Sequence, residues 1–210
     1  MVRHHPQWHA TREHLKRGEI GELRYLHVPF SYHNVDAANI RNRLDAGGGA
    51  LLDIGGYVVT AGRWFFESEP ERVVAAVDRD PAFGTDRLAS GVLDFGGGRH
   101  LAFSVATQAA PYQRLQLVGT RGRIEVQIPF NAPVDAPVRY WVDDCSRLDG
   151  GGGREHVLPV ADQYQLQVEA FSRRVREAAP DGAALAEARA TMRVVDALFA
   201  SERSGRFERV

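Results

Sequence analysis

The order of hydrophobic and polar side chains predicts a helix, a strand and a second helix in the first third of the chain. Residues 6–17 repeat apolar side chains at helical spacing, begin with a proline that suits a first helical position and are followed by a glycine. Residues 22–33 alternate and are rich in aromatic and β-branched side chains, which is typical of a strand. Residues 34–46 are polar and predict a loop, and residues 47–66 predict the second helix.

A long region of predicted strands follows. Alternating segments, separated by glycines, prolines or a short polar turn, lie at residues 71–80, 86–95, 99–108, 113–120 and 122–128. Pro111 is interpreted as a break between the third and fourth of these segments. Residues 138–144 and 154–160 predict a further hairpin around a run of glycines. Short connections and repeated alternation favour an antiparallel sheet with one covered face.

The last part of the chain is predicted to be helical. Asp162 is suited to cap a helix that places apolar side chains on one face, at Tyr164, Val168, Phe171 and Val175. Residues 183–203 predict a second helix that ends before a glycine. The order of elements indicates an α+β fold, with helices packed on one face of a large, mostly antiparallel open sheet. Because no internal repeat or linker is evident, residues 1–210 are expected to form a single domain.

Composition limits the possible classes of function. The hydrophobic fraction of 44% and the charged fraction of 25% are those of ordinary globular proteins, and a net charge of -1 argues against a nucleic-acid partner. No apolar run approaches the ~20 residues of a membrane span, and no secretory signal is evident at the N-terminus. One cysteine, Cys145, excludes an intrachain disulfide. We therefore expect a cytoplasmic protein without a membrane partner.

The segment "GGGALLDIGGYVV", residues 47–59, holds the first candidate chemistry. Four residues separate Asp53 from Tyr57, so on an α-helix the two side chains share a face, with Gly49 and Gly56 close to it. A carboxylate beside a phenol is a reasonable acid/base pair, and the glycines leave room for a flat ligand. The alternative is a helix packed tightly through its glycines, with Asp53 capping a neighbouring loop. Spacing alone favours that alternative.

Other motifs give weaker signals. His5, His9 and Glu13 follow one another at four-residue spacing and could contribute to a metal site, but a solvated helix face with one buried histidine is favoured and no metal is assigned. A strand that leads into G-x-G-x-x-G is missing, so the chain lacks a dinucleotide-binding fingerprint. The glycines at 150–153 are not followed by the lysine of a P-loop.

Several segments together resemble the Gfo/Idh/MocA oxidoreductases, in the branch that contains dimeric dihydrodiol dehydrogenase and glucose–fructose oxidoreductase. In chain order they are "RHHPQW", "GEIGELRYL", "NIR", "GGGALLDIGGYVV", "EPERVVA", "LQLVGTRGRIEV", "DQYQLQVEAF" and "ALFASERSGRFERV". In that family a dinucleotide-binding Rossmann domain precedes an α/β domain with a large open sheet, like the C-terminal domain of glyceraldehyde-3-phosphate dehydrogenase. The sequence resembles only this second domain, so the resemblance implies that the N-terminal dinucleotide-binding domain of about 120 residues is absent.

The resemblance also implies roles for particular residues. Asp53 matches the family's catalytic carboxylate and Tyr57 its proton-donating tyrosine. Arg41 matches an arginine that contacts polar groups of the substrate, and Asn39 and Gly49 complete the implied substrate-binding set. The implied reaction is hydride transfer between NAD or NADP and a carbon atom of a sugar or polyol.

The resemblance has a gap that bears on activity. The family's catalytic lysine has no counterpart, because the single lysine, Lys16, lies elsewhere in the sequence. The chain alone is therefore expected to be inactive and not to bind NAD or NADP. We expect a homodimer formed through the open sheet face. The alternative is a sugar-binding or oligomerisation module without enzymatic activity.

Overall fold

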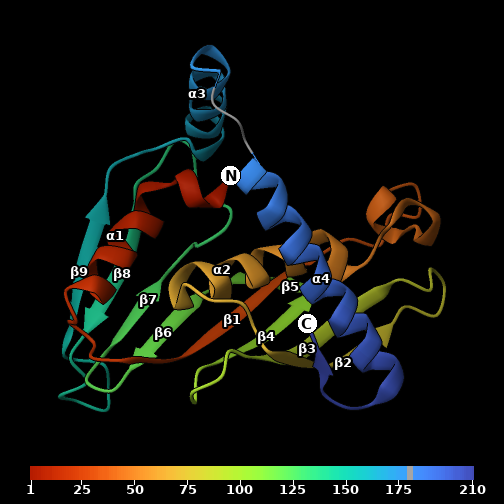
Figure 1. Cartoon of the computed structure of the whole chain (residues 1–210), viewed down its shortest axis with the longest axis horizontal. Helices are drawn as coiled ribbons and strands as arrows, with labels where there is room; N and C mark the ends of the chain where they lie inside the picture. Colours follow the sequence, from red (N-terminus) through yellow and green to blue (C-terminus); the bar gives the residue numbers. More distant parts are fainter. Residues whose placement is uncertain (179–181) are drawn as a thin grey trace. The chain divides into compact units, whose positions relative to one another are not determined.

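The computed structural model describes residues 1–178 and 182–210 (Figure 1). These residues form two compact units. The α1 unit comprises Met1–Arg24 and Arg114–Glu187, and the α2 unit comprises Tyr25–Gln113 and Ala188–Val210. Each unit combines strands with helices, which confirms the predicted mixture of both classes of element.

The sheet of the α2 unit has the strand order β10-β2-β3-β4-β1, and β5 also pairs with β1. Its strands are β1 (Leu23–His33), β2 (Arg72–Arg79), β3 (Asp86–Asp94), β4 (His100–Ala106), β5 (Gln108–Gln113) and β10 (Glu208–Arg209). The pairs β10–β2, β2–β3, β3–β4 and β1–β5 are antiparallel, as predicted for most of the sheet. The pair β1–β4 is parallel, and α2, β2 and β3 supply the long connection that a parallel pair requires.

Strand β5 is missing from the sequence-based prediction. Pro111 was interpreted as a break, yet it lies within β5, which pairs with β1 through Ser31 and Tyr112. Proline is tolerated in a strand where its missing N–H is not needed by a second neighbour. The predicted strands at 71–80, 86–95 and 99–108 are confirmed, with ends that differ by one or two residues.

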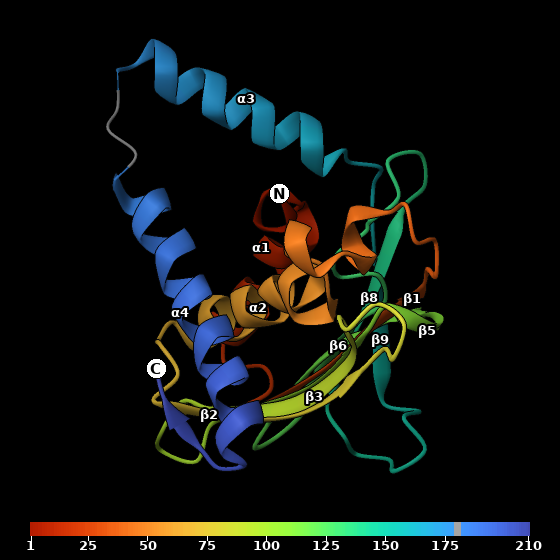
Figure 2. The ribbon, with the colours of Figure 1, turned by 90° about the vertical axis from the view of Figure 1, so that its right-hand side faces the viewer.

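Helix α2 (Gly56–Phe66) and helix α4 (Gly182–Ser204) lie on the same side of β2 and β3 (Figure 2). A Cβ atom at Gly62 of α2 would lie 2.7 Å from the Phe95 ring, so only glycine allows this close approach to the end of β3. Ser201 of α4 accepts a hydrogen bond from the backbone N–H of Ala75 at 3.1 Å, which ties the helix to β2. Between the helices and the sheet lies a fully buried apolar core that includes Leu26, Val28, Val59, Leu93, Leu101 and Val105.

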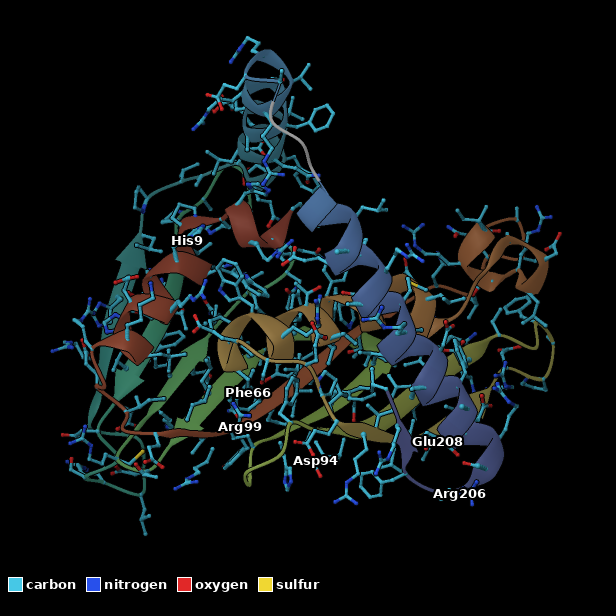
Figure 3. All side chains as sticks on the ribbon, in the orientation of Figure 1. His9, Phe66, Asp94, Arg99, Arg206 and Glu208 are labelled. Atoms are coloured by element: carbon cyan, nitrogen blue, oxygen red, sulfur yellow. The ribbon has the colours of Figure 1, made fainter. Side chains whose placement is uncertain are left out.

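The turn between β3 and β4 is fastened to the end of α2 by one arginine. Arg99 donates hydrogen bonds to the carbonyl oxygens of Phe95, at 2.9 Å, and Gly96, at 3.2 Å. Its guanidinium carbon also lies 5.7 Å from the centre of the Phe66 ring, and Figure 3 shows the two side chains next to each other. Arg99 therefore links the turn between β3 and β4 to Phe66, the last residue of α2.

The α1 unit contains a second group of antiparallel strands, in the order β6-β7-β8-β9. These are β6 (Leu115–Gly119), β7 (Arg123–Val126), β8 (Val138–Asp143) and β9 (Gly153–Leu158), which confirms the four predicted segments. Helix α1 (Pro6–Lys16) begins at the predicted proline, and the indole of Trp8 donates a 2.8 Å hydrogen bond to the carbonyl oxygen of Pro129. Trp8 and Phe130 are buried in the core of this unit, where their rings lie close to each other.

Helix α3 (Gln163–Arg176) has the predicted cap, because Asp162 accepts hydrogen bonds from the backbone N–H groups of Tyr164 and Gln165. Its apolar face is nevertheless exposed: Tyr164, Val168, Phe171 and Val175 keep 50–63% of their surface accessible. The periodicity thus predicted the helix correctly, but it did not predict that the apolar face would be exposed. None of the helices in the described ranges is long and apolar enough to cross a membrane.

Candidate active site

Asp53 lies in a π-helical turn, Leu51–Gly55, that leads directly into α2. Its carboxylate is mostly buried, with 20% of the side-chain surface exposed. Oδ2 accepts a 2.5 Å hydrogen bond from the hydroxyl of Tyr32, and Oδ1 accepts a 3.0 Å hydrogen bond from Nε of Arg41. Asp53 therefore connects the π-helical turn with β1 and with the segment that carries Arg41.

The predicted loop 34–46 contains two short 3₁₀ turns, η2 (Ile40–Asn42) and η3 (Leu44–Ala46). Asn39 caps η2, because its Oδ1 accepts a 3.0 Å hydrogen bond from the backbone N–H of Arg41. The structure thus brings Arg41 into direct contact with Asp53, whereas Asn39 acts on Arg41 through the backbone. The substrate-binding roles of Asn39 and Arg41 stay predictions.

The glycines of residues 47–49 precede the helix instead of lying within it. The backbone N–H of Gly49 donates to the carbonyl oxygen of Arg41 at 2.9 Å. A Cβ atom at Gly48 would lie 2.5 Å from that same oxygen, so the backbones approach too closely for any side chain. These contacts hold the segment with Arg41 beside the turn with Asp53.

Gly49 is required by a second contact, with Asp86 at the start of β3. Its φ of +122° is strained for other residues, and its Cβ direction is occupied by Oδ1 of Asp86. The carboxylate of Asp86 caps the helix by accepting a 2.7 Å hydrogen bond from the backbone N–H of Leu51. Sequence reasoning missed Asp86, because its position in a strand gives no sign that it contacts residues 49–51.

Tyr57 lies beyond the π-helical turn, where its ring meets the Phe30 ring edge to face at a centroid distance of 5.9 Å. Phe30 and Tyr32 are two residues apart on β1 and therefore on the same face of the strand. One strand face thus contacts both predicted catalytic residues. The four-residue spacing rule assumed an α-helix, and it does not apply across a π-helical turn.

Tyr32 is the other residue that sequence reasoning missed, although its alternation with Phe30 was visible. Burial, followed by the hydrogen bond to Asp53, raises the pKa of the Tyr32 hydroxyl well above its ordinary value, and the nearby Arg41 opposes this change. The phenol therefore remains protonated at neutral pH and acts as a hydrogen-bond donor.

The residues of the possible metal stripe have other contacts. Nδ1 of the buried His5 accepts a 3.2 Å hydrogen bond from the backbone N–H of Gln7 and caps α1. Glu13 pairs with Lys16 at 2.9 Å. Within residues 1–178 and 182–210, no three histidine, cysteine, aspartate or glutamate side chains are placed to hold a metal ion together.

A separate concavity of about 340 Å³ lies in the α1 unit, and it contains none of the predicted site residues. Arg123 and Asp143 form an ion pair of 3.0 Å within it, and Asp143 is almost fully buried. The concavity is lined by Arg123, Glu125, Trp141, Asp143, Asp149, Gly150 and Gly153.

Comparison with known proteins identifies relatives along the whole chain. An uncharacterized oxidoreductase of Rhizobium meliloti is 40% identical over 210 residues, which cover all of this chain and 63% of the relative. A D-xylose 1-dehydrogenase (NADP(+)) of Haloferax volcanii is 32% identical over 208 residues, which cover 98% of this chain and 61% of the relative. The chain therefore spans about 60% of the length of these curated relatives.

Solved structures share the fold. A 3-ketoreductase from Actinomadura kijaniata, in complex with NADP and TDP-benzene, matches 95% of this chain and 60% of its own with a TM-score of 0.88 at 24% identity. An aldose-aldose oxidoreductase from Caulobacter crescentus, complexed with glycerol, matches all of this chain and 62% of its own with a TM-score of 0.82 at 20% identity.

The family assignment comes from a match to a family model. Residues 8–125 match the GFO/IDH/MocA C-terminal domain. This range makes up more than half of the chain and includes Asn39, Arg41, Gly49, Asp53 and Tyr57. The chain belongs to the GFO/IDH/MocA family, and it matches the C-terminal domain of that family.

Proposed function

We propose that this chain is the substrate-binding and dimerisation domain of an NAD(P)-dependent oxidoreductase that acts on a sugar, a polyol or a related carbonyl or alcohol. The observation that carries the proposal is the carboxylate of Asp53, held by Tyr32 and Arg41 inside the family-matched region. The names of the relatives, which include a D-xylose dehydrogenase and 3-ketoreductases of deoxysugars, support a sugar-like substrate.

The proposed chemistry concerns the hydroxyl group of the substrate. A carboxylate has about four lone-pair directions. Two of those of Asp53 are used by Tyr32 and Arg41, which leaves the others for a substrate hydroxyl. Tyr57 would take up or deliver the hydroxyl proton, as a general acid/base. The Arg41 side chain is 46% exposed and would bind further oxygen atoms of the substrate.

The cofactor, NAD or NADP, would supply the hydride. The glycines beside Asp53 do not form a cradle for its phosphates, because the chain itself fills the Cβ directions of Gly48 and Gly49. The filled space at these two glycines supports a cofactor site elsewhere. We propose that a separate dinucleotide-binding domain holds the cofactor and provides the family's catalytic lysine, and that the chain alone is inactive. Cytoplasmic localisation is part of the same proposal.

Dimerisation is proposed for the face of the α2-unit sheet that points away from α2 and α4. Side chains that are small or apolar lie next to one another there: Val74, Val92 and Ala102 form one row across the strands, and Ala76, Ser90 and Ser104 form the next. The outer rows carry ion pairs, including Arg72–Asp94 at 2.8 Å. A centre of small and apolar side chains with a charged rim supports an interface between identical subunits.

A second candidate is a sugar-binding or oligomerisation module without enzymatic activity. The filled glycine directions and the position of Lys16, which pairs with Glu13 on α1, support this alternative. The chain would then bind sugars by the same side chains but would carry out no hydride transfer in any combination of domains.

One experiment separates the two candidates. The chain is joined to the part of the H. volcanii dehydrogenase that lies outside the match, and NADP reduction is followed at 340 nm with D-xylose and a panel of sugars and polyols. We expect activity from the joined protein and none from the chain alone. Saturable quenching of NADPH fluorescence by the chain alone would contradict the proposal that a separate domain binds the cofactor. Sugar binding without turnover in the joined protein would favour the non-enzymatic module.

A further inference from the structure

The carboxylate of Asp53 is held by side chains from two other elements. Tyr32 comes from β1, where it donates to Oδ2 at 2.5 Å, and Arg41 comes from η2, where it donates to Oδ1 at 3.0 Å. Because each oxygen accepts a bond from within the chain, the orientation of the carboxylate is fixed before a substrate arrives. Such preorganisation lowers the cost of reaching a productive geometry.

The two donors differ in their exposure to water. The Arg41 side chain is almost half exposed, so solvent weakens its attraction to Asp53. The hydroxyl of Tyr32 is more shielded, and the bond it donates to a charged acceptor is of the stronger kind. The hydrogen bond from Tyr32 therefore contributes substantially to the orientation of Asp53, even though Arg41 is the donor that carries a charge.

The local backbone explains why Asp53 needs an anchor on another element. In the π-helical turn Leu51–Gly55 the regular α-helical hydrogen-bond pattern is interrupted, so the helix alone does not fix the direction of the side chain. The same face of β1 also supports Tyr57 through Phe30. A change in β1 at Tyr32 would thus alter the position of Asp53 relative to Tyr57.

We propose that Tyr32 is a positioning residue, whose hydroxyl holds the Asp53 carboxylate so that its remaining lone pairs point toward a substrate hydroxyl. The inference rests on the proposed function, because it assigns Asp53 the role of binding the substrate. Tyr32 keeps its own proton throughout: its O–H bond does not break, and the proton of the substrate passes to or from Tyr57.

The first test uses the chain alone and does not depend on activity. Tyrosines are labelled with ¹³C at Cζ, and the exchange of each hydroxyl proton with water is measured by NMR. We expect exchange at Tyr32 to be about tenfold slower than at Tyr164, because a hydrogen bond to a charged group stabilises the closed state by at least ~1.4 kcal/mol. Asp53→Asn should accelerate exchange at Tyr32 and leave Tyr164, which is exposed on α3, unchanged. Equal exchange at both positions would overturn the proposal.

The second test uses the joined protein described above. Tyr32→Phe keeps the ring and removes the hydroxyl, and we expect kcat to fall about tenfold with KM changed less than twofold. Tyr164→Phe makes the same chemical change on the exposed face of α3 and should alter neither constant.

A double variant decides whether Tyr32 acts through Asp53. In an Asp53→Asn background, Tyr32→Phe should cause no further loss, whereas a merely structural role would lower kcat again. An unchanged kcat in the single variant, or a full further loss in the double variant, would overturn the proposal. If no joined protein oxidises a sugar, the proposed function fails, and the exchange measurement still decides whether Tyr32 holds Asp53.

Discussion

Oδ1 of Asp86 occupies the space in which a Cβ atom of residue 49 would lie, at only 1.9 Å from its ideal position. The other oxygen of this carboxylate caps the helix at Leu51. The side chain of Asp86 on β3 therefore leaves room only for a glycine at position 49, and it also caps the start of the turn that carries Asp53. This relationship leads to the first two predictions.

Gly49→Ala is expected to lower the free energy of unfolding by about 3 kcal/mol or more, because it combines a backbone at φ +122° with a clash against Asp86. Gly98→Ala is the matched control: its φ is +75°, but no atom lies within 4 Å of the new Cβ, so a loss of about 1 kcal/mol is expected. Urea unfolding followed by circular dichroism measures both. Equal losses in the two variants would show that the contact with Asp86 is not what requires the glycine.

The buried Asp86 should make stability depend on pH. Burial raises the pKa of its carboxyl, and the Leu51 N–H opposes the change. The native state therefore keeps this proton to higher pH than the unfolded chain does, so the contribution of the group is greatest below about pH 4 and is lost as the pH rises through the native pKa. Asp86→Asn removes the titration. The stability of the wild type minus that of the variant should fall as the pH rises above 4, and a difference independent of pH would contradict the assignment.

Tyr57→Phe should lower kcat of the joined protein by about 100-fold, the usual loss when a general acid/base is removed. The aromatic contact with Phe30 is kept by the new ring, so the fold should be preserved, as checked by thermal unfolding. Tyr164→Phe on the exposed face of α3 serves as the control and should retain full activity. An unaffected rate in Tyr57→Phe would remove this residue from the mechanism.

The proposed dimer can be tested at the centre of the open face. Val92→Arg places a charge between Val74 and Ala102 and should convert the dimer to a monomer in light scattering, because an unpaired charge is costly at the core of an interface. Val168→Arg introduces the same side chain on the exposed face of α3 and should leave the dimer intact. A monomeric wild-type chain would contradict the proposed interface.

Local patterns were sufficient to predict most elements of the fold. Pro6 and Asp162 marked the starts of α1 and α3, and alternation marked the strands that pair with close neighbours in the sequence. The pairing of strands that are far apart in the sequence could not be predicted in the same way. Neither the parallel alignment of β1 with β4 nor the role of Pro111 inside β5 follows from local spacing, because both depend on which strand becomes a neighbour.

The candidate site was predicted only in part, because some of its contacts also join residues that are far apart in the sequence. Asp53 and Arg41 were named from the sequence, and the structure places them in contact. Tyr32, which contacts Asp53, and Asp86, which contacts Gly49 and Leu51, lie on strands 21 and 33 residues away from Asp53 in the sequence, so no local pattern connects them with the site. The π-helical turn also departs from the four-residue rule, which describes only regular α-helices.

The parallel pairing of β1 with β4 has a consequence for the order of folding. Tyr25 aligns with His100, 75 residues later, whereas β2 and β3 are joined by a short turn. Closing the longer loop costs more chain entropy, so the β2–β3–β4 meander should form before β1 joins it. On the ribosome, β1 has no β4 to pair with until residue 106 has been made. During that interval the strand that carries Tyr32 is exposed and prone to non-native pairing.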